Sequence, residues 1–190
     1  TASGFFSHEG DQARVVASGS YETGEYTSAS LSLQGGATVT GHGAALHRNS
    51  VMGGTRLMVD TQGVADVPVR GNGGATRTNR FGKAVITDVN SYYRNQTSID
   101  LDTLPDDVEA TQSIIQATFT EGAIGYRRFD VIAGAKAMVI ILMADRDAPP
   151  FGATVKNSRG QETGIVGEEG WTYLGGMQPD ETMTLNWGGS

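Results

Sequence analysis

The chain is poor in several residue types, and each shortage excludes a class of protein. None of its 190 residues is cysteine, so it has neither a disulfide framework nor thiolate ligands for zinc. Lysine and arginine number 14 against 21 acidic residues, and the formal charge of −7 argues against nucleic acid as a partner. The longest apolar run, AMVIILMA at residues 137–144, is far shorter than a membrane-spanning helix.

Two of these shortages also carry expectations about context. The lack of cysteine suits a reducing compartment and a disulfide-free part of an exported protein equally well. The sequence has neither a start methionine nor a signal-like segment, so we expect an excerpt or a processed chain. The run at residues 137–144 has the length and composition of a strand, and we expect it to be buried on both faces.

Glycine is the residue in excess. The chain contains 27 glycines, about twice the usual share. Glycine weakens helices and supplies turns, and helix-forming residues do not accumulate anywhere with a clean helical period. The composition therefore predicts an all-β fold made of many short strands.

The first part of the chain alternates strictly between small apolar and hydroxyl side chains. In residues 26–40, alanine, leucine and valine occupy the odd positions, and serine, threonine and glutamine occupy most of the even ones. Residues 13–21 alternate less strictly, and the segment ETGE at 22–25, with Gly24, is a plausible hairpin turn between the two. This pattern fits a half-buried antiparallel hairpin of a soluble domain, and it also fits a pair of transmembrane β-barrel strands.

From residue 48 onward, short hydrophobic strands alternate with turn signals. Such spacing predicts Greek-key β-sandwiches, and we place a boundary near Phe129 between two small all-β units. Pro149 and Pro150 cannot lie in a central strand, so they predict a loop before Phe151. Among the aromatic residues of the second unit, Phe151, Trp171 and Tyr173 are expected in the core.

Metal sites have little support in the sequence. His8, His42 and His47 match no common zinc spacing, and we interpret them as surface or strand-end residues. The segment DLDTLPDD resembles a calcium-binding loop only superficially, because Pro105 stands near the expected ligands and no glycine follows. We predict no metal and no cofactor.

Catalytic constellations are equally weak. A glycosidase would need two converging carboxylates, but the adjacent residues Asp106 and Asp107 point to opposite faces of an extended chain. The segment around them could open a helix behind Pro105, although the isoleucines that follow favour a strand. We predict an acidic turn that leads Val108 into a strand, and a protein that is not an enzyme.

Several of these segments, taken in order, resemble outer-membrane ushers of the chaperone–usher (fimbrial or pilus) pathway. The resemblance begins with TNRFGKAV at residues 78–85, YRNQ at 93–96 and LDTLPDDVE at 101–109. It continues with TEGAIGYRRFDV at 120–131, PPFGATV at 149–155, TGIVGEEGWTYLGG at 163–176 and MTLNWGG at 183–189. Each piece alone is weakly specific, but their order covers nearly the whole chain.

The resemblance implies a domain organisation. Residues 1–47 would be the last strands of the usher's transmembrane β-barrel. Residues 48–128 would form a first C-terminal periplasmic β-sandwich domain, and residues 129–190 a second. Because the family places a cysteine pair just beyond NWG, the second domain is expected to be truncated in this chain.

The resemblance also implies a function and a location. A usher in the bacterial outer membrane, with its C-terminal domains in the periplasm, binds periplasmic chaperone–pilus subunit complexes. It supports subunit assembly and secretion by donor-strand exchange, in contact with other domains of the same usher. The alternative is a tandem β-sandwich binding module of a bacterial surface adhesin.

For partner binding, we select the segment YYRN. Tyr92, Tyr93, Arg94 and Asn95 combine two aromatic residues and an arginine at the expected end of a strand, a composition that anchors interfaces. The alternative interpretation is that at least one of the two tyrosines belongs to the core.

Overall fold

The computed structural model describes residues 1–24, 26–49, 54–72 and 74–188. Within these ranges it consists of strands and of two short 3-10 helices, η1 (Leu101–Thr103) and η2 (Glu168–Gly170), which confirms the all-β prediction. In the described ranges, no helix is long and apolar enough to cross a membrane. The chain forms two compact units: unit 1 comprises residues 1–100 and 113–129, and unit 2 comprises residues 101–112 and 130–190.

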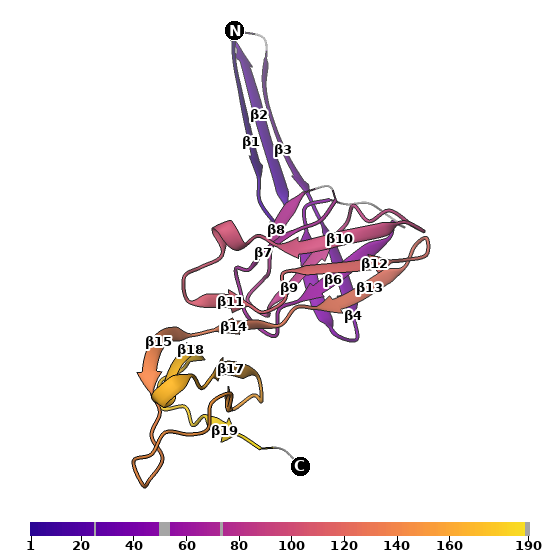
Figure 1. The fold of residues 1–190 in the computed structure, drawn as a ribbon. Coiled ribbons are helices and arrows are strands. Elements are labelled where there is room, and N and C mark those ends of the chain that lie inside the picture. Colours follow the sequence, from indigo (N-terminus) through magenta and orange to yellow (C-terminus); the bar gives the residue numbers. More distant parts are fainter. Residues whose placement is uncertain (25, 50–53, 73, 189–190) are drawn as a thin grey trace. The chain divides into compact units, whose positions relative to one another are not determined.

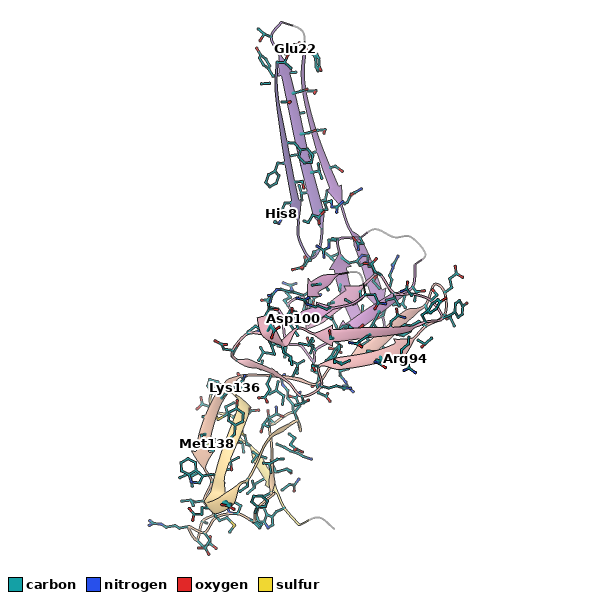
Figure 2. The ribbon with its side chains drawn as sticks, turned by 45° about the horizontal axis from the view of Figure 1, so that its top comes forward. His8, Glu22, Arg94, Asp100, Lys136 and Met138 are labelled. Carbon is teal, nitrogen blue, oxygen red and sulfur yellow. The ribbon has the colours of Figure 1, made fainter. Side chains whose placement is uncertain are left out.

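Unit 1 begins with a long three-stranded antiparallel sheet, made of β1 (Ala2–Glu9), β2 (Arg14–Glu22) and β3 (Tyr26–Gln34) (Figure 1). The predicted hairpin between β2 and β3 is confirmed, with Gly24 in the left-handed region at φ +87°, whereas Glu25 lies outside the described residues. Figure 2 marks the two ends of this sheet, with Glu22 at the tip and His8 near the base.

The pairing register gives this sheet two different faces. On one face, Ala17 of β2 lies between Phe6 of β1 and Leu31 of β3. Val15 and Leu33 pair on the same face. The other face is rich in serine, and hydroxyl groups pair across it, with Ser18 and Ser30 oxygens 2.8 Å apart and Ser20 and Ser28 oxygens 2.7 Å apart. The side chains of β1 and β3 are solvent-exposed, including Phe6, Leu31 and Leu33, whereas Val15, Ala17 and Ser20 of the central strand β2 are half-buried.

The alternating segment 26–40 is not one strand, as the sequence suggested, because it breaks at Gly35. A separate hairpin follows, formed by β4 (Gly36–Thr40) and β5 (Gly43–His47). Its inner side is buried through Thr38, Ala45 and His47. The His47 ring is held by Thr38 Oγ1 at 3.0 Å and by the Asn49 carbonyl oxygen at 2.6 Å, which gives this predicted surface or strand-end histidine a structural role.

The rest of unit 1 consists of two sheets. The first has the order β12-β10-β7-β8, and the second has the order β13-β6-β9, in which β13 runs parallel to β6. Their bounds are β6 (Arg56–Asp60), β7 (Pro68–Arg70), β8 (Ala75–Arg77), β9 (Lys83–Ile86), β10 (Arg94–Ile99), β12 (Ile114–Thr118) and β13 (Ile124–Arg128). The fully buried side chains of unit 1 include Leu57, Met58, Val59, Val67, Val69 and Phe129.

Unit 2 contains three small sheets, with the orders β11-β14, β15-β18 and β17-β16-β19. Their bounds are β11 (Val108–Ala110), β14 (Val131–Ala133), β15 (Ala135–Ile140), β16 (Thr154–Lys156), β17 (Glu162–Ile165), β18 (Trp171–Met177) and β19 (Thr184–Asn186). Its core is built on Ala153, Val155, Val166 and Leu174, with Val139 and Ile141 packed against it.

Two expectations about unit 2 are wrong. The run at residues 137–144 is not buried on both faces, because β15 alternates and turns Met138 and Ile140 outward, 61% and 50% exposed. Trp171 and Tyr173 lie opposite these two residues on β18 and are about half exposed as well, while Phe151 is 77% exposed. Residue type predicted a core position, but strand parity assigns the β15 and β18 side chains to the outer face, and Phe151 lies in a turn before β16.

A charged cluster joins the three strands of the sheet β13-β6-β9. The Asp60 carboxylate is 7% exposed and accepts hydrogen bonds from the Tyr126 hydroxyl at 2.5 Å and the Gln62 amide at 2.8 Å. Lys83 Nζ lies 2.6 Å from the same carboxylate. The Tyr126 ring stacks on His42, with centroids 4.1 Å apart, so the cluster ties the β4–β5 hairpin to the sheet β13-β6-β9.

This cluster predicts a loss of stability in acid. Burial alone would raise the pKa of Asp60, but the hydrogen bonds from Lys83, Tyr126 and the Gln62 amide outweigh it and lower the pKa below its usual value. Because the folded state favours the carboxylate, this contribution is complete above the unfolded value and is lost as the pH falls through the folded pKa. Hydrogen exchange over β6 and β9, corrected for intrinsic rates, should show weaker protection at about pH 3 than at about pH 5. Equal loss in Asp60→Asn, which has no carboxyl to titrate, would contradict this assignment.

Candidate partner-binding site

The segment that the sequence selected spans the end of the loop between β9 and β10, with Tyr92 and Tyr93, and the start of β10, with Arg94 and Asn95. Tyr92 has a left-handed backbone at φ +65°, which is uncommon for a bulky residue. Its amide donates a hydrogen bond to the Phe119 carbonyl oxygen at 2.7 Å, which helps to hold this conformation. Tyr92 and Tyr93 are 67% and 72% exposed, so the alternative that one of them is a core residue is wrong.

Asn95 differs from its neighbours because its side chain is buried, only 3% exposed. Its Oδ1 accepts hydrogen bonds from the Asn90 amide at 2.9 Å and from Asn72 Nδ2 at 2.6 Å. Its Nδ2 donates to the carbonyl oxygens of Asn90 at 2.8 Å and Tyr93 at 2.9 Å. Asn95 therefore shapes the loop that presents the tyrosines, and its own side chain does not face solvent.

A second loop, between β12 and β13, packs beside the first. Thr55 Oγ1 lies 2.7 Å from Ser91 Oγ of the tyrosine loop and accepts a hydrogen bond from the Gly122 amide at 3.0 Å. The same hydroxyl is within 3.2 Å of the Thr120 carbonyl oxygen. One buried threonine thus connects both loops, and it holds them as a single platform.

The platform carries positive charge next to aromatic rings. Arg94 begins β10 opposite Thr118 of β12, is exposed, and is labelled at the periphery of unit 1 in Figure 2. The Arg127 guanidinium lies 5.4 Å from the centre of the Phe119 ring, within the range of a cation–π contact. We call the exposed set Tyr92, Tyr93, Arg94 and Arg127, with Phe119 beneath it, the tyrosine–arginine platform.

Sequence reasoning found part of this platform and missed the rest. Phe119 and Arg127 come from segments that are distant along the chain, and no motif connects them to the YYRN segment. The one signal that was available is Gly125, because a Cβ atom at this position would collide with the Phe119 ring, at only 2.1 Å from its nearest atom. Glycine at this point is what lets the ring lie against β13.

The acidic stretch is structural. Asp106 and Asp107 are exposed in a turn, in which the Val108 amide donates to the Pro105 carbonyl oxygen at 2.9 Å. The buried Val108 then starts β11, as predicted. Across the described ranges, no group of three histidine or acidic side chains is placed to hold a metal ion.

Comparison with protein families identifies similarity along nearly the whole chain. The family model described as "Outer membrane usher protein" matches residues 1–129, and the "PapC C-terminal domain" model matches residues 138–190. The chain is 59% identical over 186 residues to the putative outer membrane usher protein YfcU of Escherichia coli K12. It is 50% identical over 185 residues to the outer membrane usher protein PapC of Escherichia coli.

These alignments cover most of this chain but a small part of each relative. They include 98% of the chain and 21% of YfcU, and 97% of the chain and 22% of PapC, so the chain spans about a fifth of their length. A cryo-EM structure of an E. coli P pilus tip assembly intermediate, PapC-PapD-PapK-PapG, matches with a TM-score of 0.65 and 49% identity. That match covers 99% of this chain and 23% of the solved one.

Proposed function

The chain belongs to the outer membrane usher family, and we propose that it is the C-terminal part of a fimbrial usher that binds chaperone–subunit complexes. In this proposal it supports pilus subunit assembly and secretion by donor-strand exchange and catalyses no bond-breaking reaction. The observation that carries the proposal is the family match over residues 1–129, combined with an exposed platform of tyrosine and arginine in the same unit.

The partners are proposed from the complex in which a relative has been solved. The solved PapC structure is an assembly with PapD, PapK and PapG, described as a P pilus tip assembly intermediate. A complex of this kind presents extended strands and sheet edges, whose main-chain groups give affinity when a strand is added. Tyrosine and arginine are the residues that most often anchor such interfaces.

The location is proposed from the two faces of the first sheet. We infer that β1 to β3 belong to the usher's transmembrane barrel, within the domain that we place at residues 1–47. The apolar face would contact lipid and the serine-rich face would line the lumen. The periplasmic domains proposed at residues 48–128 and 129–190 then follow, in a protein of the bacterial outer membrane. No observation favours the alternative of an adhesin module.

Exchanging Tyr92, Tyr93 and Arg94 together for Ala tests the platform. Truncating one interface anchor costs roughly 2 kcal/mol, so we expect chaperone–subunit affinity to fall at least about 30-fold and pilus assembly to fail. Asn95 stays unchanged, because its loss would collapse the loop. Pilus number per cell and complex affinity are measured, together with usher abundance in the outer membrane, which should not change.

The matched control is Gln96→Ala with Gln116→Ala. These two exposed residues lie on the same sheet, with their side chains 3.5 Å apart, and carry neither aromatic rings nor charge. We expect normal assembly from this control. Unimpaired assembly by the triple variant would show that the platform is not the partner site.

A further inference from the structure

A second apolar surface of unit 1 lies on the outer side of the β4–β5 hairpin. Val39 and Leu46 are 74% and 56% exposed, and Ala37 and Ala44 are exposed between them. Cross-strand pairing brings Ala37 next to Leu46 and Val39 next to Ala44. We call these four residues the hairpin face, and nothing in the described part of unit 1 covers it.

The hairpin face continues the sequence alternation of β3. Strand parity is kept from β3 to β4, so Leu31 and Leu33 share their parity with Ala37 and Val39 across Gly35. The opposite parity is polar along the whole length, with Ser30 and Ser32 in β3 and Thr38 in β4. The apolar stripe is therefore longer than the sheet β1-β2-β3 alone.

This length decides where the hairpin face would lie in a membrane. A barrel strand crosses the apolar core with about 9–11 residues, and β1 to β3 contain 8 or 9 residues each. The three strands are therefore almost long enough to cross the apolar core of a membrane. If these strands span the membrane, the hairpin face, which follows β3 in the chain, would lie at the level of the lipid headgroups on the periplasmic side.

The loop between β8 and β9 adds an aromatic ring and a cation to this surface. Phe81 is 59% exposed, and the Arg80 guanidinium lies 4.6 Å from the centre of its ring. Asn79 bridges the loop, because its Oδ1 accepts hydrogen bonds from the Phe81 and Lys83 amides at 2.9 and 3.0 Å. Asn79 Nδ2 donates to the Ala44 carbonyl oxygen at 3.1 Å, which fixes the loop to the hairpin.

Phe81 also lies near the turn between β1 and β2, at the base of the first sheet. Together with Arg80, it lines a shallow cavity of about 450 Å³ whose other walls include Leu46 and Gln12. Gln12 belongs to the turn between β1 and β2. The ring is therefore close to the same end of the sheet as the residues that would emerge from the membrane.

We propose that Phe81, Arg80 and the hairpin face bind the periplasmic leaflet of the outer membrane, as an interfacial anchor for the first periplasmic domain. The inference rests on the proposed function, which supplies the membrane. The ring and the apolar side chains enter the boundary between headgroups and acyl chains, and the guanidinium pairs with lipid phosphate. An exposed aromatic ring beside an arginine is the side-chain pair that suits this boundary, whereas water alone gives the ring no favourable partner.

Fluorescence quenching by labelled lipid tests the anchor. The full-length protein carrying Phe81→Cys is labelled with a thiol-reactive fluorophore and reconstituted in phospholipid vesicles with a nitroxide either on the headgroup or deep in the acyl chain. We expect the headgroup nitroxide to quench the label several-fold more than it quenches a label at Phe151→Cys, an exposed site in unit 2. The protein without introduced cysteine measures background labelling.

A label at Leu31→Cys distinguishes a failure of the proposed barrel strands from a failure of the proposed anchor. It should be quenched most by the deep nitroxide if β3 spans the membrane. Loss of that signal would contradict the proposed barrel strands. A normal Leu31 signal with a Phe81 signal no stronger than that of Phe151 would overturn the anchor alone. The anchor is also wrong if neither nitroxide quenches the Phe81 label and the label is shielded only when a chaperone–subunit complex is added.

Discussion

Replacing Asp60 by Ala is expected to destabilise unit 1 by about 3–5 kcal/mol, because it breaks a buried ion pair on one side only. Lys83 Nζ would lose a carboxylate at 2.6 Å, and the Tyr126 hydroxyl an acceptor at 2.5 Å. The Lys83 side chain is only 14% exposed, so water compensates poorly for the lost carboxylate. A stability loss of this size is a large fraction of the total for a small domain.

Hydrogen-exchange mass spectrometry of the full-length protein measures this effect. Peptides that cover β6 and β9 should lose most of their protection in Asp60→Ala. The control is Asp88→Ala, the same substitution at an exposed position two residues after the end of β9, where we expect a change within about 0.5 kcal/mol. If the two variants exchange alike, the cluster around Asp60 does not hold unit 1 together.

The second large effect is expected from placing a charge on the apolar face of β3. Leu31→Arg puts a guanidinium opposite Ala17, near the middle of the sheet β1-β2-β3. If this face contacts lipid, the change costs about 2–4 kcal/mol at the midplane of the membrane. We therefore expect much less folded usher in the outer membrane, read from heat-modifiable mobility on gels.

The neighbouring residue provides a matched control. Ser30→Arg introduces the same charge one position away, on the face where Ser30 and Ser18 oxygens lie 2.8 Å apart. A lumen-facing arginine remains hydrated, so the folded protein should reach the outer membrane in near-normal amount. A reversal of the two results would mean that the faces are assigned the wrong way round, and equal results would contradict the barrel strands.

The local features of this fold could be predicted well from the sequence. Alternation along residues 26–34 predicts β3 and its two faces, and Gly24 marks the turn before it. The acidic stretch is similar, since the turn behind Pro105 and the strand that begins at Val108 depend only on neighbouring residues. In these places the side-chain period and the turn residue specify the backbone without help from distant segments.

Features that depend on distant pairing could not be predicted in this way. Asp60 and Tyr126 meet because β6 and β13 lie side by side, although they are 66 positions apart. Asn95 looked like part of an exposed motif, yet Asn72 and Asn90 enclose its amide. The outward position of Met138 and Trp171 likewise follows from the register of β15 and β18, which residue type alone does not determine.

The two units interlock along the chain, and this has a consequence for how a nascent usher would mature. Residues 101–112 leave unit 1 to pair with β14 in unit 2, and the chain then returns to complete unit 1 with β12 and β13. Because β6 must wait for β13, the first domain cannot close until almost 70 further residues have been exported. No single cut separates the units either, since a chain that stopped at Phe129 would leave β11 as an unpaired edge, the kind of edge that recruits a neighbouring chain. The first domain can therefore close only after β13 has been exported, and the second only after β19 has followed, about 60 residues later.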